Sequence, residues 1–531
     1  MVTIGKKSKF LIIFWVFFYI FVFGLLIKNS FSSLDPDFGW HLRVGEEVAS
    51  TRMVPHANNY NYTYTGNWVD HEWLSNLIVY EIYNNYGYLA LNIFFALIIL
   101  FSLLVLNYFA RRFSDKISDS LLAVLQIFAL TACLPHFGIR IQEFGFLFMA
   151  LELWIIMEFD RKVSWRVLLC LLPLFYLWSN MHGSFLLGLG LLIAYPLAKL
   201  FQRYLSFGKL EKYFQGFKII QWSEVSTFYI FTLGSVLVTL ITPYGFELYS
   251  FLSGYKNTYY LGAIKEWLPQ FHFPYDYLQL LYLALVLVVL GQLIYVCIRY
   301  KSRAINIWQL GLTLILIFLS FKSRRHFPLL VVASFIFLIQ SLQEFLDLEN
   351  IKAQTVKKKY KYFIILCLVL TVTNQYLNID IKKDPFSNYC NEYPCLAAEF
   401  LQKDVKLQNI NIFNEYNWGG YLIWAYPTKK LFIDGRLPQT EYAGHTFLEE
   451  YVEFLKPKAD FASKLEKYKI GIVLIKTKEE KIKARNWEKF LFLIKDKELN
   501  QPNYLKRYLD SAQNWEKIYS DPLATIYLKI Y

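Results

Sequence analysis

The sequence predicts a polytopic α-helical membrane protein of about eleven spans, followed by a small C-terminal α/β domain. Hydrophobic residues make up 56% of the 531 residues and gather in blocks along most of the chain. Each block is roughly 17–25 residues long, which is the length that a helix needs to cross a bilayer. Lysine and arginine cluster in the segments between the blocks, as they do in cytoplasmic loops. The C-terminal segment differs, because its apolar runs are short and separated by polar ones.

The basic clusters also predict an orientation. Lys6, Lys7 and Lys9 hold the N-terminus in the cytoplasm. No small-residue cleavage site follows the first apolar block, so we interpret it as a retained span of a cell-membrane protein and not as a signal peptide. The expected spans are 10–26, 89–110, 121–135, 144–159, 167–179, 185–201, 228–241, 278–298, 307–321, 327–346 and 362–377.

This map divides the chain into two domains. A transmembrane domain occupies 1–380 and has a first outer loop at 31–88, whereas an extracytoplasmic domain occupies 381–531. The formal charge of +13 is explained by loops that face the cytoplasm and by attraction to the bilayer surface. No soluble module concentrates a basic face, so nucleic acid is not an expected partner.

The C-terminal segment alternates strand-like and helix-like runs. The short β-branched or aromatic runs are 409–413, 430–433, 470–475 and 524–530. Helical periodicity marks 446–455 and 461–468, so a small α/β domain of about 130–150 residues is expected. Gly419-Gly420 suggests a tight turn, and Asp434-Gly435-Arg436 ends a strand. Neither pattern is long enough for a phosphate-binding glycine loop, and we interpret both as structural.

Six cysteines show no metal-ligand spacing. Cys133, Cys170, Cys297 and Cys367 lie in apolar runs and are expected in the core. The pair in YCNEYPC, Cys390 and Cys395, either closes a small disulfide outside the cytoplasm or remains as two thiols.

Two groups of basic residues break the charge rule. Lys322, Arg324 and Arg325 stand at the outer end of the ninth expected span, and Arg140 stands at the outer end of the third. Either a helix has been missed and these side chains reach outer headgroups, or they form an anion pocket. Arginine suits the second interpretation, since its rigid fork binds phosphate through two donors. His182, at the outer end of the fifth span, is either a structural partner or part of such a site.

The first outer loop carries two acidic clusters next to predicted hydrocarbon. The first contains Asp35, Asp37 and His41, and the second is Asp70-His71-Glu72. Carboxylates are costly at a bilayer, which makes such clusters functional candidates. A desolvated carboxylate can act as a general base. Asp35 and Asp37 are also the candidate ligands if a magnesium or manganese ion is bound, although simple helix capping remains open for both. No P-loop or nucleophile elbow is present.

The order of these features resembles the GT-C superfamily of membrane glycosyltransferases, which use polyprenyl-phosphate-linked sugars. DPDFGWHLRVGEEV matches the acidic motif after the first span, and NWVDHEWL matches the second polar motif before the next one. With RIQ, NMHG, TPYG, KEW, NWGGYLIW and FIDGR, the chain resembles an uncharacterised bacterial branch over nearly its whole length. HEWL departs from the Lys-Pro-Pro type of the lipid A aminosugar transferases, so the acceptor stays open.

The resemblance implies roles for single residues. Asp37 would deprotonate the acceptor hydroxyl, with Asp35 as its partner or as a metal ligand. His71 and Glu72 would position the donor or the acceptor. The remaining candidate substrate-binding residues are His41, Asp70 and His182, with Arg140, Arg324 and Arg325 for the lipid phosphate.

The expected function is therefore an inverting transfer of a sugar from a polyprenyl-phosphate donor to an extracytoplasmic lipid, glycan or protein. Two alternatives remain. A transporter of lipid-linked glycans would favour charges within the membrane, for which Glu143 and Glu152 are the candidates. A non-catalytic envelope scaffold would need neither acidic cluster.

Overall fold

The computed structural model describes residues 6–32, 34–113, 118–206, 219–256, 258–300, 306–348, 390–438, 440–442, 444–457, 460–495 and 500–530. It divides into two compact units. The helical unit comprises Met1–Ser33, Ala90–Gly245 and Lys265–Ile381. The α/β unit comprises Leu34–Leu89, Phe246–Ile264 and Lys382–Tyr531. The first loop, which the sequence assigned to the membrane domain, thus clusters with the C-terminal segment.

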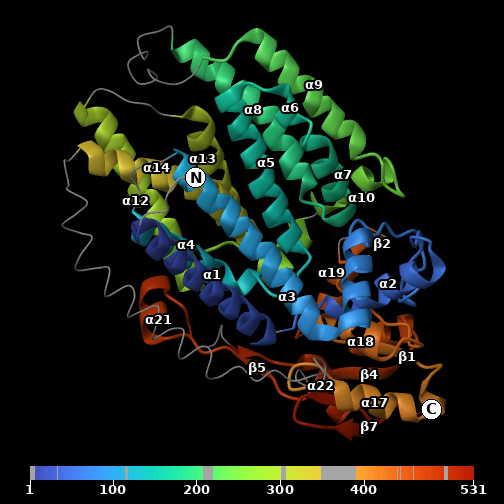
Figure 1. Cartoon of the computed structure of the whole chain (residues 1–531). Coiled ribbons are helices and arrows are strands. Elements are labelled where there is room, and N and C mark those ends of the chain that lie inside the picture. The colour runs from blue at the N-terminus through green and yellow to red at the C-terminus, as the bar shows by residue number, and fades with distance from the viewer. Residues whose placement is uncertain are drawn as a thin grey trace. The chain divides into compact units, whose positions relative to one another are not determined.

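The helical unit is a bundle of long apolar helices (Figure 1). Its main helices are α1 (Lys6–Ser32), α3 (Trp73–Phe113), α4 (Asp119–Cys133), α5 (Gln142–Lys162), α6 (Trp165–Leu168), α7 (Leu171–Met181), α8 (Phe185–Leu205), α9 (Trp222–Val238), α12 (Tyr277–Tyr300), α13 (Ile307–Lys322) and α14 (Phe327–Leu348). Helix α14 packs against α13, α12 and α5, and its residues from Phe327 to Ile339 are largely buried. Helix α3 begins in the α/β unit and is interrupted at Gly87, whose φ of 79° is accessible mainly to glycine.

Six helices in the described part of the chain are long and apolar enough to cross a membrane. They are Leu11–Phe31, Trp73–Arg112, Asp119–His136, Phe185–Leu205, Tyr277–Tyr295 and Arg324–Leu342. Shorter apolar helices at Trp165–Met181, Trp222–Val238 and Ile307–Lys322 coincide with the fifth, seventh and ninth expected spans. Helix α5 coincides with the fourth, and the eleventh lies outside the described residues. A membrane protein is therefore supported, while the count of about eleven stays a prediction.

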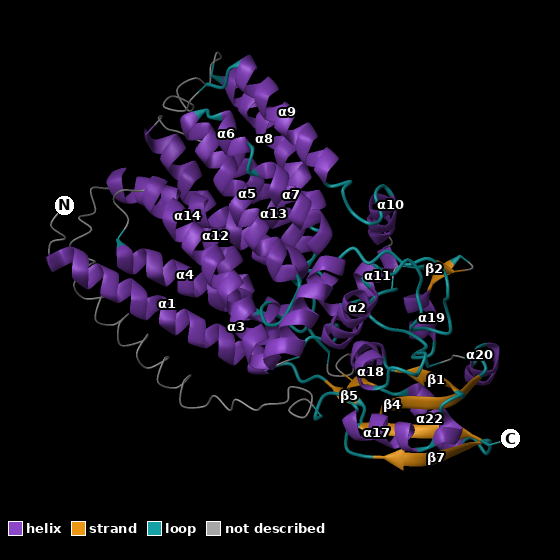
Figure 2. Ribbon diagram, turned by 45° about the vertical axis from the view of Figure 1, so that its right-hand side comes forward, coloured by secondary structure: helices purple, strands orange, loops and turns teal. Residues whose placement is uncertain are grey.

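The α/β unit contains a four-stranded sheet in the order β1-β4-β8-β7 (Figure 2). Strand β1 (Asn411–Asn414) runs parallel to β4 (Ile470–Lys476), and β8 (Ala524–Lys529) is antiparallel to both β4 and β7 (Trp515–Ser520). The flanking helices are α17 (Cys395–Lys403), α18 (Gly419–Ala425), α19 (Phe447–Glu453), α20 (Phe461–Lys467), α21 (Asn486–Phe492) and α22 (Tyr504–Ser511). Two short ribbons pair β2 (Glu441–Tyr442) with β3 (His445–Thr446) and β5 (Glu480–Lys481) with β6 (Asn500–Gln501).

The first loop adds α2 (Phe38–Thr51) to this unit, and the segment after α9 adds α10 (Glu247–Ser253) and α11 (Thr258–Ala263). Helix α2 packs on α18 at very short range. A Cβ at Gly39 would lie 2.3 Å from the carbonyl oxygen of Gly420. Two backbones can approach this closely only where neither carries a side chain.

Several local predictions need correction. Gly419 and Gly420 begin helix α18 and do not form a tight turn. Residues 430–433 make only an isolated bridge, between Leu431 and Asn61, and no strand. Cys170 is exposed on the helical unit and is not a core residue, whereas Cys133 is buried. Of the two alternatives for the remaining pair, Cys390 and Cys395 form the disulfide.

Candidate functional site

Asp35 and Asp37 lie in the tight turn that leads into α2. The side chain of Asp35 accepts a hydrogen bond from the backbone N–H of Asp37 at 2.8 Å, and its carbonyl accepts from Phe38 at 3.1 Å. Asp37 occupies the N-cap position of α2, but its side chain makes no capping hydrogen bond. Helix capping, the structural alternative for these residues, therefore does not explain the Asp37 carboxylate.

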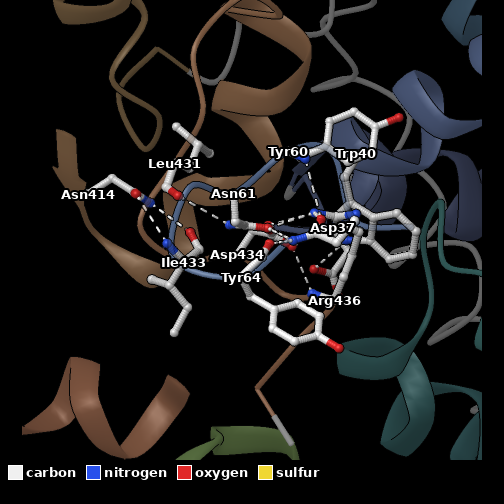
Figure 3. A network of polar contacts seen from close by, with 11 residues as sticks. Asp37, Trp40, Tyr60, Asn61, Tyr64, Asn414, Leu431, Ile433, Asp434 and Arg436 are labelled. Atoms are coloured by element: carbon white, nitrogen blue, oxygen red, sulfur yellow. Dashed lines mark hydrogen bonds and ion pairs between the residues drawn. The ribbon is translucent and has the colours of Figure 1, made fainter. Parts of the chain in front are cut away.

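The Asp37 carboxylate instead lies against two neighbours, Trp40 and Gly435. The indole Nε1 of Trp40 donates to Oδ1 at 2.9 Å. On the other side lies the backbone of Gly435, where a Cβ would stand only 2.0 Å from the same oxygen. Figure 3 shows Asp37 and Trp40 beside the residues that surround Arg436. Two segments that lie far apart in the sequence thus fix the orientation of the candidate base.

Arg436 is the centre of a buried polar network that the sequence interpretation treated as merely structural. Its guanidinium group donates to both oxygens of Asp434 at 2.9 Å, and neither side chain has any exposed surface. Nη2 also donates to Asn58 and Asn61 of the first loop, each at 3.0 Å. The signal available in the sequence was an aspartate directly after the apolar run 431–433, with an arginine two residues after that aspartate.

Aromatic rings complete this network. The guanidinium carbon of Arg436 lies 4.5 Å from the ring centre of Tyr60 and 4.7 Å from that of Trp68. Cation–π attraction of this kind is strongest where water is excluded. The cation therefore fastens the 58–68 segment of the first loop to the C-terminal segment.

Asp70 and His41 are joined through Asn76, a residue that the sequence analysis did not select. The amide nitrogen of Asn76 donates to both oxygens of Asp70, at 3.0 and 2.9 Å. Its amide oxygen lies 2.6 Å from Nδ1 of His41. That oxygen can only accept, so the network assigns the proton of neutral His41 to Nδ1 and leaves Nε2 as a proton acceptor.

Burial shifts the pKa values of both ionisable groups in this chain of contacts, Asp70 and His41. Burial raises the pKa of the Asp70 carboxyl to about 7, against the hydrogen bonds from Asn76. Burial likewise lowers the pKa of the His41 imidazole, against the attraction of Glu72 and Asp35. The Trp40 ring lies against that of His41, with ring centres 3.7 Å apart and the planes tilted by 42°, and this contact links the His41 chain to Asp37.

His71 and Glu72 lie next to each other with Nε2 and Oε1 3.4 Å apart. The His71 ring packs against Phe251 and Tyr255, at 5.5 and 6.1 Å between ring centres. Both partners come from the segment that contains α10. The α/β unit thus brings all six acidic and histidine candidates of the first loop together in one body.

The metal hypothesis finds little support in the donor set. Among the residues that the structure describes, no group of three or more His, Cys, Asp or Glu side chains is arranged to hold a metal ion. Asp35 Oδ1 and Asp37 Oδ1 already accept hydrogen bonds. Magnesium requires near-octahedral oxygen ligands, which these two side chains do not supply by themselves.

The arginines that break the charge rule lie in the helical unit, and two of them share one carboxylate. Arg140 forms an ion pair with Oε1 of Glu266, and Arg325 lies 4.0 Å from Oε2 of the same residue. Arg325 also stacks over Trp267, 5.0 Å from the ring centre. Burial alone would raise the pKa of Glu266, but Arg140 and Arg325 lower it to about 2. Glu266 is therefore ionised.

Arg324 and His182 are engaged differently. Arg324 is buried and donates through Nη2 to the carbonyl of His272, while its Nε has no hydrogen-bond partner in the described part of the chain. Nδ1 of His182 accepts from the backbone of Ser184 at 3.2 Å in the turn between α7 and α8. Its position favours the structural alternative. Convergence of Arg324 and Arg325 with Asp37 on one cavity stays a prediction.

Comparisons with known proteins identify the fold. Neither the protein-family models nor the curated proteins contain a match to this chain. Solved structures do match, beginning with the apo oligosaccharyltransferase of Archaeoglobus fulgidus, at a TM-score of 0.54 and 11% identity over 89% of this chain and 70% of that one. The chain has a GT-C fold.

Two further oligosaccharyltransferase structures from Archaeoglobus fulgidus agree. One is tethered to an acceptor peptide containing the NVT sequon and matches with a TM-score of 0.52 and 10% identity over 87% of this chain and 69% of that one. The other, AglB in complex with an inhibitory peptide and a dolichol-phosphate, matches with a TM-score of 0.50 and 11% identity over the same shares, 87% and 69%. At identities this low, the structural similarity shows the fold alone.

Proposed function

We propose that this protein is an inverting membrane glycosyltransferase that transfers a sugar or glycan from a polyprenyl-phosphate-linked donor to an extracytoplasmic acceptor. The observation that carries the proposal is the Asp37 carboxylate. It stands at the start of α2, does not cap the helix, and is oriented by Trp40 and Gly435. A GT-C fold supports the same reaction, since the dolichol-phosphate complex belongs to a protein of this fold.

In the proposed reaction Asp37 is the general base. An acceptor oxygen attacks the anomeric carbon of the donor as the bond from that carbon to the phosphate oxygen breaks. The acceptor proton moves to the Asp37 carboxylate, and the electron pair leaves with the polyprenyl phosphate. Because attack and departure take place on opposite faces of the sugar, the configuration inverts.

His41 is the proposed acceptor-binding neighbour of Asp37. Its Nε2 can accept a hydrogen bond in the tautomer that Asn76 and Asp70 favour. Asp70, His71 and Glu72 belong to the same α/β unit and are proposed to position the substrates.

The leaving group needs positive charge, and Arg140, Arg324 and Arg325 are the proposed source. Preorganised cations at a developing phosphate lower the barrier without reorganisation. The unsatisfied Nε of Arg324 fits an anion, and the ion pairs of Glu266 hold Arg140 and Arg325 in place until the lipid phosphate arrives.

The disulfide supports an extracytoplasmic α/β unit. Disulfides persist in oxidising compartments and are rare in the cytosol. The Cys390–Cys395 bond is therefore consistent with the orientation that the charge rule predicts, with a cytoplasmic N-terminus.

The test is glycan and lipid profiling of a strain that lacks the protein, complemented with wild type, Asp37→Asn or Glu46→Gln. Loss of the base is expected to reduce the affected glycosylated species by about a hundredfold or more. Glu46 is the matched control, because it lies on the same helix but pairs with Arg43 at the half-exposed surface. A strain whose glycans are unchanged by the deletion would contradict the proposal, as would full rescue by Asp37→Asn.

A transporter of lipid-linked glycans is the second candidate, and Glu152 favours it. This residue of α5 is fully buried, and neither carboxyl oxygen has a hydrogen-bond partner among the described residues. Buried carboxyl groups within membrane helices often serve transport. A transporter would keep its activity in Asp37→Asn and lose it in Glu152→Gln, which is the reverse of what the transferase predicts.

A further inference from the structure

We propose that the Asp434-Gly435-Arg436 segment forms one wall of the catalytic site, in which Gly435 is a positioning residue that holds the carboxylate of Asp37. This inference rests on the proposed function. It assigns to the C-terminal segment a direct part in the reaction, in addition to covering the first loop.

The contact at Gly435 leaves no room for a side chain. A Cβ there would lie 2.0 Å from Oδ1, 3.1 Å from Cγ and 3.5 Å from Oδ2 of Asp37. The atoms that would collide belong to a short side chain that is itself hydrogen-bonded to Trp40. A methyl group at this position must therefore displace either the carboxylate or the backbone of the wall.

The backbone on either side of Gly435 is held in place. Directly after Gly435, the side chain of Arg436 is buried with Asp434 and bonded to Asn58 and Asn61. Directly before it, Asp434 lies against α18, since a Cβ at Gly419 would stand 2.6 Å from the Cβ of Asp434. The backbone on both sides of Gly435 is thus fixed by buried contacts.

The backbone next to Asp37 is held in place as well. The residue before it, Pro36, is in close contact with α18, because a Cβ at Gly420 would lie 2.1 Å from the Pro36 carbonyl oxygen. One helical turn later Gly39 meets the carbonyl of Gly420. Two glycines of the C-terminal segment, Gly420 and Gly435, therefore lie against the turn that carries the base.

The expected effect of Gly435→Ala follows from these contacts. The methyl group forces the carboxylate out of its orientation and disturbs its hydrogen bond from Trp40. A displacement near 1 Å can reduce turnover by about a hundredfold. Loss of the hydrogen bond to the ionised form also makes Asp37 easier to protonate, so the acid limb of the activity profile should move to higher pH.

The contact itself is tested by a thermal-unfolding cycle on the purified full-length protein. Gly435→Ala is expected to lower the Tm in the wild-type background and to have a much smaller effect in the Asp37→Ala background, where the colliding atoms are absent. Gly262→Ala is the control, because this helical glycine of the same unit has open space around its Cβ position. Equal Tm losses in the two backgrounds would overturn the proposed contact.

The role in catalysis is tested by product formation in isolated membranes as a function of pH. The glycosylated species is the one lost in Asp37→Asn. Gly435→Ala should reduce its formation and shift the acid limb, whereas Gly262→Ala should do neither. Unchanged product formation in Gly435→Ala, despite a coupled Tm, would overturn the positioning role. Failure of the proposed function is seen separately, since Asp37→Asn would then retain activity while the unfolding cycle requires no substrate.

Discussion

At the scale of single residues, Asp70 shows how burial sets a protonation state. Only 1% of its surface is exposed, and its partners are an amide and a backbone N–H. The hydrogen bonds from Asn76 and the attraction of His71 do not offset the desolvation of the carboxylate. The pKa of about 7 means that Asp70 exchanges its proton near neutral pH in the folded protein.

This gives a sign for the pH dependence of stability. The folded-state pKa of about 7 is above the unfolded value of 3.8, so the folded state binds more protons between these values. The stabilisation is complete below the lower value and is lost as the pH rises through the upper one. We therefore expect the Tm of the wild type, relative to that of Asp70→Asn, to decrease between about pH 4 and pH 8.

The measurement is tryptophan-fluorescence unfolding of both proteins in detergent across that range. Subtracting the variant removes the contributions of other titrating groups, such as His41. A Tm difference that increases with pH would show that Asp70 is stabilised as a carboxylate and would contradict the raised pKa.

At the scale of elements, the Arg436 network holds a loop that has little regular structure of its own. Between α2 and α3 the first loop forms one isolated bridge within itself, Ala57 with Asn67, and one with the C-terminal segment, Asn61 with Leu431. Its further anchors are aromatic and polar contacts, among them Thr63 Oγ1 donating to the carbonyl of Phe432 at 2.7 Å. Removal of Arg436 should therefore release the loop.

We expect Arg436→Met to reduce the free energy of unfolding by about 3–5 kcal/mol, because it leaves Asp434 buried without its charge partner. The control is Arg507→Met. Arg507 pairs with Glu479 at the surface, and exposed pairs contribute less than about 1 kcal/mol. Limited proteolysis would locate the effect, with new cleavage expected between residues 52 and 68. An unfolding curve like that of the wild type would contradict a stabilising role for the network.

The same elements show what could be predicted from the sequence. Strands β1, β4 and β8 were expected, because their β-branched runs are continuous and buried. Strand β7 was not, since only Trp515 of its six residues is fully buried and the others are polar or partly exposed. Residues 430–433 have the composition of a strand. However, the side chain of Asn414 accepts hydrogen bonds from the N–H groups of Phe432 and Ile433, which takes the place of hydrogen bonds to a neighbouring strand. Local composition cannot reveal such a long-range partner.

For the candidate site, the acidic and histidine residues of the first loop were predictable, because ionisable groups next to apolar spans are unusual. Their partners were not. Gly435 and Arg436 meet the first loop across more than 370 residues, as the bond from Arg436 to Asn61 spans 375 positions. A glycine required by a distant carboxylate looks like any turn glycine in the sequence. The pairing of Glu266 with Arg140, 126 positions apart, was hidden in the same way.

At the scale of the whole molecule, the division of the chain separates two tasks. The candidate base and its neighbours belong to the α/β unit, and the arginines proposed for the lipid phosphate belong to the helical unit. Donor-lipid binding can therefore be tested independently of proton transfer. A variant of the arginine cluster should change lipid affinity, whereas Asp37→Asn should leave it nearly unchanged.

The probe is a short-chain polyprenyl phosphate, and binding is measured on the full-length protein in nanodiscs by calorimetry or native mass spectrometry. Loss of one charge-assisted contact is worth about 1.5–3 kcal/mol, so Arg140→Gln and Arg325→Gln should each weaken binding by about tenfold or more. Arg112→Gln is the control, because this arginine is exposed at the end of α3. All of these proteins should bind the uncharged polyprenol with the same affinity.

For a Glu266 variant we predict the opposite change in the affinity for polyprenyl phosphate. As an ionised carboxylate it occupies the guanidinium groups of Arg140 and Arg325 in the absence of lipid. A phosphate must compete with it, so Glu266→Gln should bind polyprenyl phosphate more tightly than the wild type while the arginine variants bind it more weakly. If Glu266→Gln instead weakens binding as the arginine variants do, the carboxylate orients the cations and does not compete. If none of the three variants changes affinity, the lipid phosphate binds elsewhere and the arginine cluster is only structural.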